Sequence, residues 1–187
     1  MSSPAVFLDR DGTINEEMGY INHLSRFQLL PGVGAAIRAL NRAGVKAVVV
    51  TNQSGAARGY FPPALVAEVH RYLEKMLAAA GAQLDGIYTC LHGPDDHCPC
   101  RKPKPALILE AARQLDLDLG RSYLVGDRYR DVETAANAGV KGILVLSGYG
   151  RGEYEYLKGA SPVAPVHVAE NLPEAVRWIL ADLKKVP

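Results

Sequence analysis

Short apolar runs alternate along this chain with longer segments in which apolar residues recur every three or four positions. The short runs are typical of buried strands, and the longer pattern is typical of helices with one apolar face. We predict strands at residues 5–8, 45–50, 86–91, 122–125 and 142–146. We predict helices at residues 32–43, 63–80, 105–115, 131–138 and 173–185. This alternation indicates an α/β fold, a Rossmann-like parallel sheet with helices on both faces.

The 187 residues fit one domain, and we expect it to span residues 1–187, without an internal repeat. One connection is long: residues 12–31 separate the first strand from its helix and contain the segment GYINH. Two interpretations stay open for it, a mobile lid or an ordinary surface loop with a buried Tyr20.

Composition narrows the class of partner. The formal net charge is +1, from 21 Lys plus Arg against 20 Asp plus Glu, so no global field attracts nucleic acid. No apolar stretch is long enough for a membrane span, and no basic segment followed by an apolar one opens the chain. We therefore expect a cytoplasmic monomer that acts on a small molecule, with no nucleic acid and no membrane partner.

Functional groups gather directly after the predicted strands. In a parallel sheet, ligands bind outside the carboxyl ends of the strands. The first four strands are followed by DRDGT at 9–13, TNQSG at 51–55, CLHGPDDHCPCRKPK at 90–104 and GDRYRD at 126–131. Each of these strand tips is rich in groups that bind phosphate or metal, so we expect one shared site there.

Asp9 and Asp11 stand two residues apart at a strand end, where both carboxylates can face one site and repel each other. A Mg²⁺ ion held by Asp9 and Asp127 relieves that repulsion. With an ordinary pKa of about 3.9, Asp9 is an oxygen nucleophile at neutral pH. Asp11 can then donate a proton to a leaving group and later take one from water.

Helix or turn capping is the alternative explanation for each aspartate alone. Four aspartates together, with Thr51 and Lys102 on the other strand tips, favour a site. For Asp131 two roles stay open, support of the metal site or capping of the helix that begins there.

All three cysteines fall within eleven positions, in the pattern C-x-H-x5-C-x-C formed by Cys90, His92, Cys98 and Cys100. Four such ligands with no vacancy describe a structural Zn²⁺ site. His97 is a rival ligand, although its adjacency to Cys98 makes tetrahedral binding awkward. The helix that follows the loop is mostly apolar, whereas a DNA-binding zinc module places a basic helix there.

The four strand-tip motifs resemble, in order, those of the haloacid dehalogenase (HAD) superfamily of phosphatases. The resemblance implies the HAD fold without a large cap domain, and an aspartyl-phosphate intermediate on Asp9. It implies that Asp11 is the general acid and base, that Thr51 bonds the phosphoryl group and that Lys102 neutralises its charge. It also implies that Mg²⁺ is bound by the side chains of Asp9 and Asp127 and the backbone carbonyl of Asp11.

A zinc loop that ends in CRKP resembles two families of this superfamily, the D-glycero-D-manno-heptose bisphosphate phosphatases and the histidinol phosphatases. The x5 spacing is similar to the histidinol enzymes. The segments FLDRDGTIN, GY and VVVTNQSGAARGYF are similar to the heptose enzymes and cover more of the substrate-facing loops. The resemblance therefore implies removal of the C7 phosphate from heptose 1,7-bisphosphate, with histidinol phosphate as the alternative substrate.

The heptose family also implies a set of substrate contacts, at Gly19, Tyr20, Asn52, Gln53, Ser54 and Arg101. Arg128 stands where that family often has lysine, and the positive charge is kept. Glu17 and Met18 stand where the heptose family commonly has Asp-His before the Gly-Tyr pair, so the family's contacts from this loop do not carry over at these two positions.

Two further classes of protein fit part of this pattern. A receiver domain also uses a phosphorylated Asp, a Thr and a Lys on a doubly wound sheet, but the acid and base at Asp11 would shorten the life of its phosphoenzyme. A polynucleotide phosphatase is disfavoured by the net charge of +1 and by the lack of a basic stripe.

Overall fold

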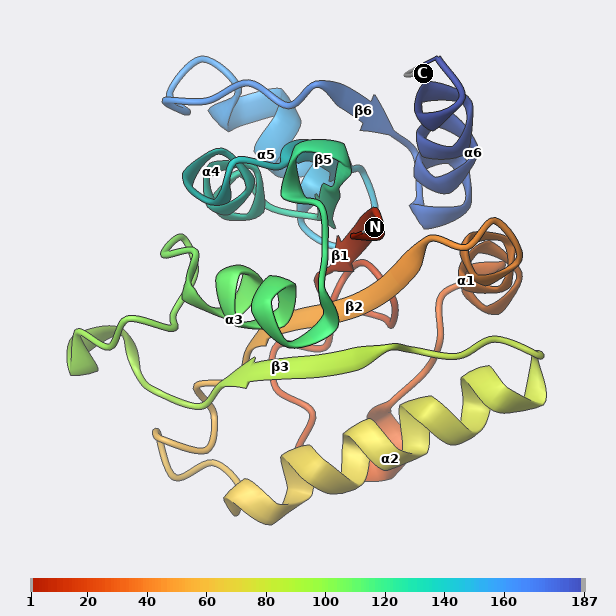
Figure 1. The fold of residues 1–187 in the computed structure, drawn as a ribbon. Coiled ribbons are helices and arrows are strands. Elements are labelled where there is room, and N and C mark those ends of the chain that lie inside the picture. Colours follow the sequence, from red (N-terminus) through yellow and green to blue (C-terminus); the bar gives the residue numbers. More distant parts are fainter. Residues whose placement is uncertain (1, 186–187) are drawn as a thin grey trace.

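The computed structural model describes residues 2–185, in which one six-stranded parallel sheet is flanked by helices (Figure 1). The strands are β1 (Ala5–Leu8), β2 (Lys46–Asn52), β3 (Gly86–Cys90), β4 (Tyr123–Gly126), β5 (Lys141–Val145) and β6 (His167–Ala169). The helices are α1 (Val33–Arg42), α2 (Pro63–Ala79), α3 (Ala106–Leu115), α4 (Tyr129–Ala138), α5 (Gly150–Leu157) and α6 (Leu172–Leu183). The predicted fold class is confirmed.

Side chains that alternate along each strand point to opposite faces of the sheet and build two apolar layers. Val6 and Leu8 of β1 pack in one cluster with α1, α2 and α6, whereas Ala5 and Phe7 pack in another with α3 and α4. Figure 1 shows α1, α2 and α6 on one side of the sheet and α3, α4 and α5 on the other. Burial on both faces explains why the strands read as continuous apolar runs.

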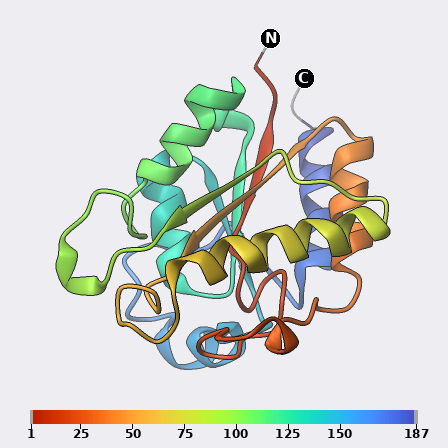
Figure 2. The ribbon, with the colours of Figure 1, turned by 90° about the horizontal axis from the view of Figure 1, so that it is seen from below.

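In the strand order β3-β2-β1-β4-β5-β6, successive strands are added on one side of β1 up to β3 and on its other side from β4 onward. The topological switch point therefore lies between β1 and β4. Loops that leave the two strands diverge there to opposite faces, which opens a crevice at their carboxyl ends. Figure 2 shows the loops gathered at one end of the molecule. This topology brings together strand tips that are far apart in sequence.

All five predicted strands and all five predicted helices are present, and no end is displaced by more than two residues. The prediction missed β6 and α5. β6 has only three residues, and α5 contains two glycines and little apolar periodicity. In the long connection a short 3₁₀ turn forms at Leu24–Arg26. Tyr20 is 40% exposed, so the alternative of a surface loop with a buried Tyr20 is wrong.

Within residues 2–185, none of the helices combines the length and the apolar character that crossing a membrane requires.

Candidate active site

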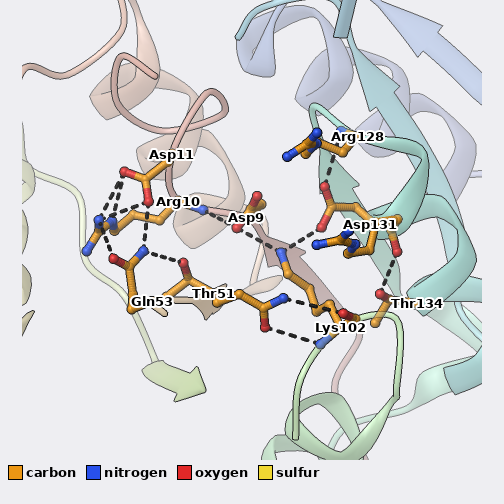
Figure 3. Close-up of polar contacts among 11 residues, drawn as sticks. Asp9, Arg10, Asp11, Thr51, Gln53, Lys102, Arg128, Asp131 and Thr134 are labelled. Carbon is orange, nitrogen blue, oxygen red and sulfur yellow. Dashed lines mark hydrogen bonds and ion pairs between the residues drawn. The ribbon is translucent and has the colours of Figure 1, made fainter. Parts of the chain in front are cut away.

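A cleft of about 260 Å³ opens at the carboxyl ends of β1, β2 and β4. All twelve residues predicted for catalysis, magnesium binding and substrate contact line it: Asp9, Asp11, Gly19, Tyr20, Thr51, Asn52, Gln53, Ser54, Arg101, Lys102, Asp127 and Arg128. Figure 3 shows the polar network that joins many of them. The sequence therefore predicted the place of the site; the roles of its residues stay predictions.

Asp9 occupies the centre of the network. Its backbone N–H donates to Val125 O on β4, which fixes the residue beside the neighbouring strand. One carboxylate oxygen, Oδ1, accepts from the backbone N–H of Arg10 at 2.8 Å and from Lys102 Nζ at 2.8 Å. Burial raises the pKa of Asp9 to about 7, against the lowering effect of Lys102. Asp9 would therefore regain its expected pKa near 3.9 only with more positive charge nearby than these residues provide.

Lys102 is 4% exposed and reaches Asp9 and Asp131 together, with Nζ 2.8 Å from one carboxylate and 2.6 Å from the other. The two carboxylates hold the pKa of Lys102 above its usual value despite burial. Asp131 also accepts from the backbone N–H of Arg128 at 3.2 Å, at the start of α4. Asp131 thus caps the helix, one of its two predicted roles, and also positions the lysine.

Asp11 is held by several donors (Figure 3). Its carboxylate accepts from Arg10, from Asn15 Nδ2 at 2.9 Å and from Gln53 Nε2 at 2.7 Å. Despite burial, the Arg10 charge and these hydrogen bonds lower the pKa of Asp11. Gln53 Nε2 also donates to Thr51 Oγ1 at 2.9 Å, so Gln53 joins the predicted acid to the predicted phosphoryl contact.

Asp127 supplies the strongest observation in favour of a cation. Its Oδ2 accepts from the backbone N–H of Tyr149 at 2.8 Å, and its Oδ1 is buried without a hydrogen-bond partner among residues 2–185. Burial and the charges of Asp9 and Asp131 raise its pKa to about 9. A Cβ on Gly12 or Gly148 would collide with this carboxylate. Only glycine therefore fits at positions 12 and 148, on either side of this carboxyl group.

Oxygens of Asp9, Asp127 and Asp131 lie within 4.8 Å of one another. A set of hard carboxylate oxygens with an unpartnered buried member suits Mg²⁺. Both carboxylate oxygens of Asp131 already accept hydrogen bonds, Oδ1 from Lys102 and Oδ2 from the backbone N–H of Arg128, so Asp9 and Asp127 are the better ligands. The residues present therefore fit the predicted ion.

The zinc ligand set also converges: atoms of Cys90, His92, Cys98 and Cys100 lie within 4.8 Å of one another. Sulfur and imidazole donors in this number suit a closed tetrahedral Zn²⁺ site, as predicted. The rival ligand, His97, is not a member of this cluster.

Arg128 lines the cleft but is strongly anchored. Its Nε donates to Glu153 at 2.8 Å, and its guanidinium lies 4.5 Å from the centroid of the Tyr149 ring. Sequence reasoning missed this wall because it followed the tips of the first four strands and not the tip of the fifth, SGYG at 147–150. Four cleft residues were missed in all: Glu17, Arg58, Arg130 and Tyr149.

Known proteins are similar to this chain in both fold and sequence. The HAD-hydrolase-like family model matches residues 99–175. D-glycero-D-manno-heptose-1,7-bisphosphate 7-phosphatase of Thermosynechococcus vestitus is 43% identical, over 98% of each chain. D-glycero-beta-D-manno-heptose-1,7-bisphosphate 7-phosphatase of Escherichia coli K12 is 40% identical, over 100% of this chain and 93% of its own.

The crystal structure of D,D-heptose 1,7-bisphosphate phosphatase from B. bronchiseptica, complexed with magnesium and phosphate, is also similar. It superposes with a TM-score of 0.88 at 36% identity, over 96% of this chain and 99% of that one. The chain belongs to the HAD-like hydrolases, in the family of the heptose bisphosphate phosphatases. The predicted resemblance is confirmed.

Proposed function

We propose that this protein hydrolyses the C7 phosphate of D-glycero-D-manno-heptose 1,7-bisphosphate and releases heptose 1-phosphate. The names of the relatives support the substrate. The observation that carries the chemistry is the position of Asp9, which faces the cleft between Lys102 and Asp127, whose Oδ1 lacks a hydrogen-bond partner among residues 2–185. With a cation held at Asp127, such a site would compensate the negative charge of a phosphoryl group on two sides, the cation on one and Lys102 on the other.

Asp9 attacks the C7 phosphorus, and the bond from phosphorus to the C7 oxygen breaks as the aspartyl phosphate forms. Because the pKa of Asp11 is lowered in the free site, Asp11 acts through its minor protonated form when it gives its proton to the departing C7 oxygen. Asp11 then takes a proton from a water molecule, which attacks the phosphorus and returns Asp9 as a carboxylate with free phosphate. Magnesium, held by Asp9, Asp127 and the Asp11 backbone carbonyl, supplies positive charge beside the phosphoryl oxygens when bound.

Lys102 neutralises the phosphoryl charge, and the Thr51 hydroxyl bonds one of its oxygens. The C1 phosphate remains outside this pocket, where Arg101 and Arg128 line the cleft. A guanidinium presents a planar fork of donors to a phosphate. Gly19, Tyr20, Asn52, Gln53 and Ser54 contact the sugar or the loops that hold it.

A substrate panel tests the proposal. In magnesium buffer, kcat/KM should be highest for heptose 1,7-bisphosphate, about 10-fold or more above fructose 1,6-bisphosphate and histidinol phosphate. Asp9→Asn should keep the fold and lose turnover, because the nucleophile and a metal ligand are removed together. A preference for histidinol phosphate would support the alternative that the x5 spacing suggests. Substantial turnover by Asp9→Asn would overturn the mechanism.

A further inference from the structure

Arg10 is the largest polar side chain in the interior, 2% exposed, and the mechanism above gives it no role. It stands between the nucleophile and the acid. Its Nε lies 3.3 Å from Asp11 Oδ1, and its NH2 group lies 3.0 and 2.9 Å from the two Asp11 oxygens. The same NH2 group lies 3.0 Å from Gln53 Oε1. One edge of the guanidinium therefore binds the Asp11 carboxylate and the Gln53 side chain.

The opposite nitrogen of the guanidinium, NH1, reaches helix α2, where His70 Nε2 lies 3.3 Å away. Arg10 has only protons to donate, so His70 Nε2 must be the acceptor, and the ring proton resides on Nδ1. Burial and the Arg10 charge lower the pKa of His70 to about 4, and the ring is neutral at neutral pH. Val69 and Leu73 pack in the core on either side of His70, which fixes this part of the helix.

We propose that His70 is a positioning residue for the acid and base step: it anchors the Arg10 guanidinium, which in turn fixes the Asp11 carboxyl toward the leaving group. This inference rests on the proposed function, because it assumes that Asp11 is the acid. A guanidinium held at both ends cannot rotate, so the carboxyl that it grips keeps one orientation. Without the acceptor on α2, a buried N–H loses its partner and the guanidinium gains freedom to turn.

Loss of the His70 contact should affect proton donation to the leaving group, and its effect should depend on how basic the leaving oxygen is. General acid catalysis matters most when the leaving oxygen is strongly basic, and little when it departs readily as a stabilised anion. Misplacement of Asp11 should therefore slow phosphoryl transfer from phenyl phosphate much more than from p-nitrophenyl phosphate. The two substrates have nearly the same size, and kcat/KM for both covers the steps up to phosphoenzyme formation.

Three substitutions at position 70 separate positioning from folding. His70→Leu removes the acceptor at similar volume. His70→Gln places an amide oxygen close to the position of Nε2, whereas His70→Asn places it one bond nearer the backbone, out of reach of Arg10. Gln and Asn thus form a matched pair that differs only in reach.

We expect His70→Leu and His70→Asn to lower kcat/KM for phenyl phosphate roughly 10-fold, with a change of less than about 2-fold for p-nitrophenyl phosphate. His70→Gln should restore most of the phenyl phosphate activity. Equal losses for both substrates, or no rescue by Gln relative to Asn, would overturn the inference and make His70 a structural residue.

Asp11→Asn, measured with the same two substrates, separates this inference from the proposed function. If Asp11→Asn discriminates strongly between the substrates and His70→Leu does not, the role of His70 fails and that of Asp11 stands. If Asp11→Asn slows both substrates equally, the assignment of the acid fails, and the inference about His70 fails with it.

Discussion

At the scale of single residues, the site holds more negative charge than its own cation neutralises. Asp9, Asp127 and Asp131 lie together, and Lys102 alone pairs with two of them. The raised pKa values of Asp9 and Asp127 record this imbalance, which burial makes larger. Such an arrangement costs stability until a cation binds, and it prepares the site for Mg²⁺.

This imbalance predicts how stability depends on pH. The folded state holds the Asp127 proton up to about pH 9, whereas the unfolded chain releases it near the ordinary value of 3.8. Because the folded state binds more protons between these values, the free energy of unfolding should fall as pH rises from about 4 to 9 in magnesium-free buffer. Asp127→Asn should flatten the slope, and added Mg²⁺ should raise the stability of the wild type more than that of the variant.

Denaturant unfolding at a series of pH values, with and without MgCl₂, measures both effects. Identical slopes for the wild type and Asp127→Asn, or equal stabilisation by Mg²⁺, would show that Asp127 is not the uncompensated charge.

At the scale of elements, the zinc loop between β3 and α3 carries two cationic site residues on a segment with little regular structure. Arg101 donates to the backbone carbonyl of His92 at 3.2 Å, and Lys104 donates to that of Cys98 at 2.6 Å. Asn52 Oδ1 accepts from the backbone N–H of Lys102 at 3.1 Å. The ligand cluster and these contacts together set the position of Lys102, so a structural metal bound by the cluster would act on catalysis from a distance.

Metal analysis should find about one zinc per chain. Cys98→Ser should lower both the zinc content and the phosphatase activity, because the loop that presents Lys102 loses its anchor. His97→Asn is the matched control: position 97 has a left-handed backbone, φ 47°, which Asn tolerates, and the side chain lies outside the cluster. Full activity in zinc-free protein, or loss of zinc in His97→Asn, would contradict the ligand assignment.

At the scale of the whole molecule, the sequence predicted the site because parallel topology brings strand tips to one edge. Asp9, Thr51 and Asp127 could be placed there from the apolar runs that precede them. The Arg10–His70 contact could not, because it joins segments 60 positions apart through side chains that no periodicity reveals. Tyr149 was missed for a simpler reason: it follows the fifth strand, whose tip, SGYG at 147–150, contains no carboxylate, lysine or cysteine.

In the proposed function, the same topology sets the orientation of the substrate. With no large cap over the strand tips, a primary phosphate on the flexible C7 arm can enter the pocket beside Asp9. The anomeric phosphate stays outside, near the cations of the cleft wall. Removal of the C7 phosphate is thus the central claim about this molecule.

Phosphorus NMR of the wild-type enzyme acting on heptose 1,7-bisphosphate in magnesium buffer tests that claim most directly. The C7 phosphate resonance should disappear as inorganic phosphate appears, while the anomeric C1 resonance persists in the product. Loss of the C1 resonance first, or loss of both at equal rates, would contradict the proposed orientation in the cleft.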